Sequence, residues 1–298
     1  MKLFFKIFCL LFLACFPSIT LSGKPQNIIL TDNQDTGSYM FVKELARIWS
    51  TSIKDRKVEF VASPEPSAVN RLRKLENNRV TAAIIDAETA YLNLDKFAGL
   101  QVLSILWSNW LIVLGKTPSP NLSITETKTM LVHENSLYFA STWKSLLPDT
   151  NFNWFNANKF PSLSELFAEE IIVLTAPVPL KEINYWIEQF PGIKLLSLDR
   201  RLVKTLRSTF NWLAPKKIPA NIFLYQTSPL QSVVWHPVLI VRKDFSISKA
   251  TKLLQIIYAQ SNSLNPHPLF DNLRITDNLP YKKIYTFHPA AKSMFNLK

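Results

Sequence analysis

Cysteine and glycine are both scarce in this chain. Its 298 residues include two cysteines, Cys9 and Cys15, near the amino terminus. If that end is removed, no disulfide, thiolate metal site or cysteine nucleophile can form. The remaining length of about 275 residues is still enough to bury a core without cross-links. Glycine occurs five times, so a glycine at a turn carries more weight here than in a glycine-rich chain.

The first 23 residues predict a secretory signal. Lys2 and Lys6 precede an unbroken apolar run from Ile7 to Phe16, and a segment of small and polar residues, 17–23, follows. This order of charged, apolar and small-residue segments is typical of a cleaved signal. The apolar run is also too short to span a bilayer, which needs about 20 residues. A buried first helix is the alternative.

Cleavage is expected after Ser22 or Gly23, which predicts a periplasmic protein. Lipid attachment at Cys15 is the alternative. The residues before it, Phe12–Ala14, fit a lipobox poorly, so we expect cleavage after Ser22 or Gly23 without lipid attachment.

The chain is basic, but its positive charge is dispersed. The formal net charge is +12, and loss of Lys2 and Lys6 with the signal leaves +10. The densest basic groups, Arg71–Lys74 and Arg200–Arg201, are predicted to lie on exposed helix faces. Nucleic-acid binding requires a continuous basic stripe with stacking aromatics, so no nucleic-acid partner is expected. The net positive charge still predicts a general attraction for anionic surfaces or solutes.

Enzyme motifs are missing from the sequence. There is no Gly-x-Ser-x-Gly elbow, phosphate-binding P-loop or Gly-x-Gly-x-x-Gly turn. The four histidines, His133, His236, His267 and His288, show no metal-ligand spacing, and three of them adjoin proline. We therefore expect no metal, no cofactor and no enzymatic activity.

Strand-like and helix-like segments alternate along the chain, which predicts an α/β protein with mainly parallel sheets. The first three strands are expected at Asn27–Leu30, Lys57–Ala62 and Thr81–Ile85, with helices between them. The proline-bearing stretch 116–121 is the best candidate linker. Beyond it the alternation restarts.

The chain is expected to return to its first unit after residue 230. The run Val233–Val241 is predicted as one strand that bends at Pro237. This pattern predicts two lobes joined by two crossings. Lobe 1 comprises residues 24–116 and 231–298, and lobe 2 comprises residues 117–230. Such a chain holds a ligand between lobes that close by a hinge.

The turn Thr36-Gly37-Ser38-Tyr39 is the strongest candidate binding element. It follows an apolar strand and opens a helix, so backbone N–H groups and the positive end of the helix dipole meet there. These groups and the hydroxyls suit a ligand carboxylate or phosphate. The alternative is an ordinary helix N-cap with Tyr39 packed below it.

Asp86 and Glu88 form a second candidate site. They lie where the third strand ends and a helix begins, which is the crevice position of open α/β sheets. Together they suit an amino group or another cation of a ligand, and a paired acid–base role is conceivable. The alternative is that Glu88 caps the helix and Asp86 faces solvent.

These segments, taken in order, resemble the TAXI family of solute receptors for TRAP-type transporters. The first strand leading into Thr36–Tyr39 resembles the family's opening, and Thr81–Tyr91 resembles its strand-to-helix turn. Further segments agree in order and spacing: 69–75, 195–198, 218–220 and 287–291. The resemblance implies a two-lobed periplasmic-binding-protein fold, type II-like, with a ligand cleft between the lobes.

The resemblance also implies a function. A monomeric receptor would capture a small anionic organic solute, a carboxylate or amino acid, and pass it to TRAP-type permease subunits. From lobe 2, Ser136, Ser141 and Pro177 would face the ligand. Lobe 2 departs from the family pattern, because the stretch 131–141 has no glycine where the family has a glycine-rich turn. This departure favours the alternative function, a periplasmic sensing or interaction protein that kept the fold but not transport.

Overall fold

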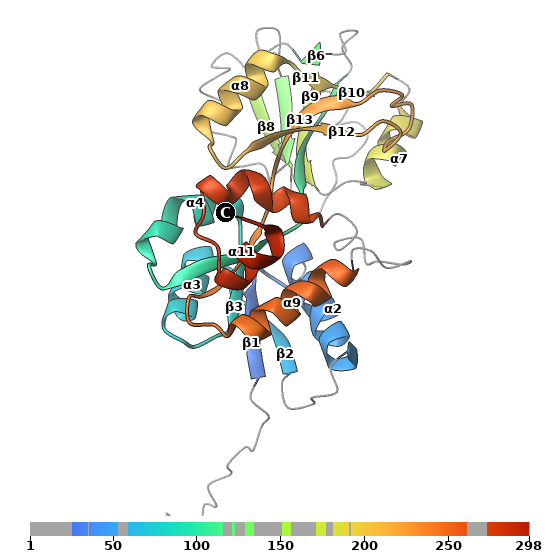
Figure 1. Ribbon diagram of the computed structural model, residues 1–298. Helices are drawn as coiled ribbons and strands as arrows, with labels where there is room; N and C mark the ends of the chain where they lie inside the picture. Colours follow the sequence, from blue (N-terminus) through green and yellow to red (C-terminus); the bar gives the residue numbers. More distant parts are fainter. Residues whose placement is uncertain are drawn as a thin grey trace, which may run out of the picture.

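The protein folds into two lobes, each built on its own β-sheet (Figure 1). The computed structural model describes residues 26–34, 36–52, 59–115, 121–122, 129–133, 151–155, 171–176, 181–190, 192–260 and 273–297. The expected signal and the predicted site residues Ser136, Ser141 and Pro177 lie outside these ranges. The α/β fold class with two lobes is confirmed.

Lobe 1, as defined by its sheet, has the strand order β2-β1-β3-β14-β4. The strands are β1 (Gln26–Thr31), β2 (Glu59–Pro64), β3 (Ala82–Ile85), β4 (Leu100–Ile105) and β14 (Val238–Arg242). β1 pairs in parallel with β2 and β3, whereas β14 runs antiparallel to β3 and β4. The carboxyl ends of β1 and β3 therefore lie at the same edge of this sheet.

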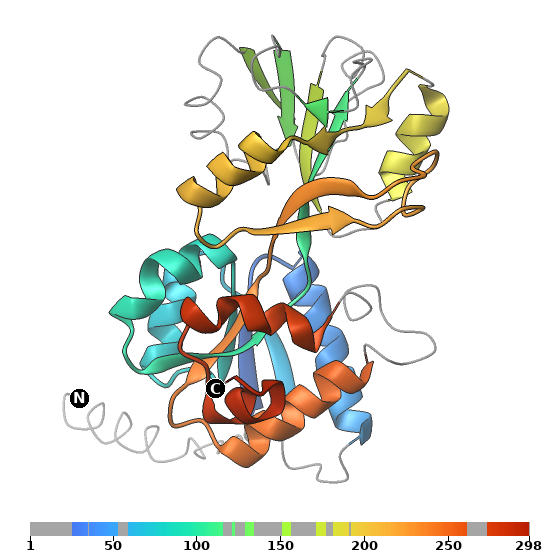
Figure 2. The same cartoon turned by 45° about the horizontal axis from the view of Figure 1, so that its top comes forward.

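Helices cover the sheet of lobe 1 (Figure 2). They are α2 (Gly37–Ser52), α3 (Ala68–Glu76), α4 (Ala87–Asn93), α9 (Ile247–Gln260), α11 (Pro289–Phe295) and the 3-10 helices η1 (Leu94–Lys96) and η3 (Ile275–Lys283). Local sequence sets several helix starts. The Ser67 side chain accepts the Asn70 N–H to cap α3, and His288 caps α11.

Lobe 2 is built on a sheet with the order β12-β13-β5-β9-β7-β8, and β10 adds to β5. The strands are β5 (Asn109–Gly115), β7 (Thr129–His133), β8 (Asn151–Phe155), β9 (Ile171–Ala176), β10 (Lys194–Leu195), β12 (Ala214–Ile218) and β13 (Leu230–Trp235). A small second sheet pairs β6 (Asn121–Leu122) with β11 (Ser197–Leu198). The helices α7 (Lys181–Gln189) and α8 (Arg200–Thr209) pack on this lobe.

Alternating side chains on the strands of lobe 2 form two apolar cores. Leu111 and Val113 of β5 face the core that α8 covers with Leu202 and Leu206. On the other face, Ile112 and its alternate neighbours belong to the core that α7 covers. The period of two along β5 thus divides the apolar run Trp110–Leu114 between two packed layers.

Two sequence expectations about the sheets need correction. The sheets are mixed rather than mainly parallel, because β14 in lobe 1 and β5, β12 and β13 in lobe 2 pair antiparallel. The run Val233–Val241 is two strands in two sheets, since the chain leaves β13 at Trp235 and enters β14 at Val238. Pro237, which has no N–H for a ladder, lies at the break.

The chain changes sheet at residues 106–108 and 236–237, which we call the crossings. They differ from the expected boundaries at 116 and 231, because the proline-bearing stretch follows β5 instead of preceding lobe 2. The crossings lie side by side, with the Leu106 N–H donating to the Pro237 carbonyl at 2.8 Å. Within the described ranges, no helix is long and apolar enough to cross a membrane.

Candidate functional site

The turn before α2 is occupied by one of the chain's own carboxylates. The Ser38 hydroxyl donates to Asp32 Oδ2 at 3.1 Å and accepts the Asp32 N–H at 3.2 Å. Thr36 acts as the N-cap, since its carbonyl accepts the Met40 N–H at 3.2 Å. Ser38 is buried, Tyr39 is half-buried and Gly37 is exposed. Asp32, which the sequence reasoning missed, therefore fills a position expected to receive an anion from a ligand.

Arg71 pairs with Asp32 from inside the lobe. Its side chain is 1% exposed and makes an ion pair with Asp32 Oδ1. Its Nη1 also donates to the Glu65 carbonyl at 2.7 Å. The expectation that Arg71–Lys74 forms an exposed face is wrong for Arg71, which lies four residues before the buried Leu75 and so shares its helix face. Arg73 is exposed, as expected.

Opposing influences act on the pKa of the Asp32 carboxyl. Burial raises its pKa, Arg71 and the Ser38 hydroxyl lower it, and the charge of Asp86 raises it again, with a net increase. Its side chain is 41% exposed despite the pair with Arg71. One face of this carboxyl therefore remains open to another partner.

Asp86 and Glu88 lie at the neighbouring strand end, after β3. Asp86 Oδ1 accepts the Thr89 N–H at 2.7 Å and caps α4. The alternative that Glu88 caps this helix is thus wrong, and Glu88 instead lies half-buried in the first turn. Burial and the charge of Asp86 both raise the pKa of Glu88.

Together these residues make an acidic edge on lobe 1, which we define as Asp32, Asp86 and Glu88. Asp86 acts electrostatically on both of the other carboxyls, so the three share one neighbourhood. The buried Arg71 offsets one of the three negative charges. When ionised, the acidic edge thus favours a cationic partner over a second anion.

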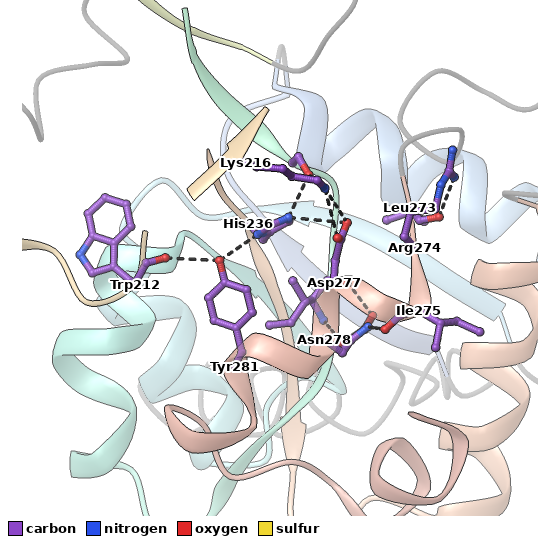
Figure 3. Close-up of polar contacts among 12 residues, drawn as sticks. Trp212, Lys216, His236, Leu273, Arg274, Ile275, Asp277, Asn278 and Tyr281 are labelled. Carbon is purple, nitrogen blue, oxygen red and sulfur yellow. Dashed lines mark hydrogen bonds and ion pairs between the residues drawn. The ribbon is translucent and has the colours of Figure 1, made fainter. Parts of the chain in front are cut away.

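A second polar cluster joins the two crossings to η3 (Figure 3). Ser108 in the first crossing lies 2.9 Å from Nε2 of His236 in the second. Lys216 of β12 forms an ion pair with Asp277 of η3 at 3.1 Å. The ring of His236 also contacts the Tyr281 hydroxyl through Nδ1 at 2.9 Å. We call these five residues the junction cluster.

Hydrogen-bond directions in the junction cluster suit a neutral His236. Lys216 donates to the Ser108 hydroxyl at 3.4 Å, and the Tyr281 hydroxyl donates to the Trp212 carbonyl at 3.3 Å. These directions are satisfied if Ser108 donates to Nε2 and Nδ1–H donates to Tyr281. Burial, the largest influence, also lowers the pKa of His236 and keeps the ring uncharged.

This geometry does not assemble a hydrolase triad. Ser108 Oγ and Asp277 Oδ2 both approach Nε2 of His236, at 2.9 and 3.7 Å. In a triad the carboxylate instead orients the opposite ring nitrogen. Here that nitrogen faces Tyr281. The junction cluster is therefore arranged to hold the crossings and η3 together.

Tyr285 connects the junction cluster with the acidic edge. Its ring stacks on Tyr281 with centroids 5.9 Å apart. Its hydroxyl donates to the Ala87 carbonyl at 3.2 Å, directly after Asp86. Burial, and then the charge of Asp86, raise the pKa of Tyr285, which stays protonated. The acidic edge and the junction cluster thus belong to one side of lobe 1, next to lobe 2.

Local sequence carried a signal for only part of this arrangement. Asp32 directly follows β1 as Asp86 follows β3, so the same reasoning would have found it. Lys216 and Asp277 are distant in sequence and have no such signal. Among the described residues, no group of three or more His, Cys, Asp or Glu is placed to hold a metal ion.

Comparisons with known proteins add resemblances of fold. No family model matches the sequence, and no curated protein matches it. A crystal structure of the substrate-binding protein of an amino acid ABC transporter is 12% identical, covering 87% of this chain and 98% of its own, with a TM-score of 0.40. XAC2383 from Xanthomonas citri bound to ATP is 9% identical, and the match covers 91% of this chain and 94% of that structure's chain, with a TM-score of 0.46. PstS from Borrelia burgdorferi is 10% identical, and the match covers 78% of this chain and 92% of the PstS chain, with a TM-score of 0.46.

Proposed function

We propose that this protein is an extracytoplasmic receptor that binds a small organic solute bearing an amino group. The observation that carries the proposal is the acidic edge, Asp32, Asp86 and Glu88, at the carboxyl ends of neighbouring strands. Ligands of open α/β sheets bind at this position. Two lobes joined by two crossings supply the hinge that such a receptor needs.

The proposed ligand is closer to an amino acid than to a simple anion. The α2 turn holds Asp32 in place of an external carboxylate, so a purely anionic solute would meet unfavourable charge. An ammonium group would complete the contacts of Asp32 and Glu88, whose carboxyls are only partly exposed. A carboxylate on the same solute would be met from lobe 2, where Ser136, Ser141 and Pro177 are the proposed residues.

The proposed mechanism is capture and release without a bond being made or broken. Closure of the lobes would remove water from the ammonium–carboxylate contacts and strengthen them. A solute without the amino group would leave buried carboxylates unpaired, which is costly and gives selectivity. The family resemblance favours delivery of the solute from the periplasm to TRAP-type permease subunits of the membrane.

Native mass spectrometry of the full chain, followed by denaturation, tests this proposal by identifying any released small molecule. Thermal-shift assays against amino acids, amines and carboxylates then rank the solute classes. Glu88→Gln should weaken binding about tenfold by removing one charge from the acidic edge. Asp95→Asn is the matched control, because Asp95 is an exposed acid on the same lobe. A protein stabilised by carboxylates alone would contradict the proposed ligand.

A sensing or interaction protein on the same fold is the second candidate. It is favoured by the pairing of Asp32 with Arg71 and Ser38, which leaves the α2 turn filled without a ligand. An empty protein that responds to no solute in the panel would favour this candidate. Capture of a solute that bears an amino group would favour the receptor.

A further inference from the structure

We propose that a basic recess at the far end of lobe 1 binds a phosphate group. The recess lies where β1 begins and β14 ends. The start of β1 is at the end of lobe 1 away from lobe 2 (Figure 1). It encloses about 350 Å³. Its polar lining comes from three segments and includes Asn27, Asn78, Arg79, Arg242, Ser246 and Lys249. This site is separate from the acidic edge and does not depend on the proposed receptor function.

Positive charge dominates the recess. Arg79, Arg242 and Lys249 line it, and Asp244 is the one acid among its lining residues. Within the described part of the chain, neither Arg79 nor Lys249 has an ion pair. Asp244 pairs with Arg242 at 2.8 Å, which holds the pKa of Asp244 below its usual range and keeps it ionised. Two positive charges therefore remain uncompensated around a single small volume.

The guanidinium of Arg242 is held in position by two partners. Its Nε donates to Asp244 Oδ1, and its Nη1 donates to Asn78 Oδ1. Asn78 itself adopts a left-handed backbone conformation, φ 58°, directly after α3. Nη2 of Arg242 has no hydrogen bond to any described residue. A positioned guanidinium with a free Nη2 loses little entropy when it binds an oxyanion.

The start of α9 adds backbone donors to the same recess. Ser246 precedes this 14-residue helix, and its carbonyl accepts the Ala250 N–H at 2.9 Å. The first amides of α9 have no partner within the helix, and of these the Lys249 N–H donates to the Ser246 hydroxyl at 3.5 Å. With Lys249 in the first turn of the helix, these groups suit a compact, doubly charged oxyanion. A doubly charged phosphate group matches the two uncompensated positive charges.

The phosphate can come from a soluble molecule or from a lipid headgroup, and titrations of the full chain distinguish the two sources. One arm uses inorganic phosphate and calorimetry. The other uses sedimentation with phosphatidylcholine vesicles, with and without phosphatidic acid. The test variant combines Arg79→Ala and Lys249→Ala, both exposed positions whose loss should not disturb folding. Lys252→Ala is the matched control, an exposed lysine on α9 that does not line the recess.

We expect the double variant to weaken binding about tenfold or more, which is the loss of one or two charge-assisted contacts. The control should change binding less than about twofold. Binding of inorganic phosphate supports a soluble source, and binding only to vesicles with phosphatidic acid supports a lipid source. Absence of binding in both arms would overturn the proposal, and so would equal losses in the double variant and the control.

Discussion

Lys216 Nζ lies 3.1 Å from Asp277 Oδ1, and this ion pair ties β12 of lobe 2 to η3 of lobe 1. The same lysine lies 5.5 Å from the ring of Trp110. Another contact between the lobes runs from the Asn211 amide to the Tyr91 hydroxyl at 2.9 Å. A hinge motion must therefore pivot about these polar contacts or break them.

Removal of the Lys216–Asp277 pair should weaken the contact between the lobes. We expect Lys216→Met to lower the free energy of unfolding by about 1 kcal/mol, because the lysine is 38% exposed and solvent screens part of the pair. Lys217→Met, at an exposed position on the same strand, should have an effect smaller than about 0.5 kcal/mol. Urea denaturation measures both. Equal losses in the two variants would mean that the pair does not hold the lobes together.

Acidification should destabilise the protein through His236. Burial lowers the pKa of His236 in the folded state, so between that value and the unfolded pKa of about 6.5 only the unfolded chain binds the proton. Stability should therefore fall as the pH drops below about 6.5, by up to about 1.4 kcal/mol per pH unit for this one group. The free energy of unfolding measured from neutral to mildly acidic pH tests this expectation.

His288 contributes in the same direction and serves as the comparison. Burial lowers its pKa as well, although its ring also contacts the Phe245 carbonyl at 2.9 Å. His236→Gln should reduce the pH dependence below about 6.5 and leave the part that is due to His288. An unchanged pH slope in His236→Gln would show that this ring is not buried neutral in solution.

The strands around the acidic edge could be predicted because their signals are local. β1 and β3 are short apolar runs, and Asp86 follows the second of them directly. Their parallel pairing then places both carboxyl ends at one edge. Residues at such strand ends need no long-range information, which is why Asp86 and Glu88 could be named from the sequence.

The partners of these residues could not be predicted in the same way. Arg71 belongs to a run that reads as a charged, solvated helix face, and only its packing against the end of β1 buries it. The junction cluster depends on η3 returning to the crossings from late in the chain. The run 233–241 is predicted as one strand with a bend at Pro237, and a bend alone does not indicate that its two halves belong to different sheets.

Arg71 should matter far more for stability than its neighbour Arg73. Arg71→Leu removes the ion pair to Asp32 and the hydrogen bond to the Glu65 carbonyl, and it leaves buried polar groups unmatched. We expect a loss of about 2–4 kcal/mol, at the lower end if water reaches the partly exposed Asp32. Arg73→Leu changes an exposed position on α3 and should cost less than about 0.5 kcal/mol. Similar losses of stability in the two variants would show that Arg71 is exposed to solvent.

Tyr225 adopts a left-handed backbone conformation, which residues other than glycine, asparagine and aspartate rarely take. Its φ is 58°, and the residue is 83% exposed. The next residue, Gln226, fixes the loop, since its side-chain amide donates to the Pro219 carbonyl at 2.7 Å and its oxygen accepts the Phe223 N–H at 3.2 Å. The loop therefore imposes this conformation on Tyr225 with little help from its own side chain.

Glycine and alanine should rank in opposite order at position 225 and at a nearby control. At Tyr225 the glycine variant should be more stable than the alanine variant by about 1 kcal/mol, because alanine keeps the left-handed cost. At the exposed Thr227, where φ is not positive, glycine should be less stable than alanine by about 0.5–1 kcal/mol, because it loses more backbone entropy on folding. Urea denaturation of the four variants provides the comparison. The same order at both positions would show that Tyr225 is not held in the left-handed region.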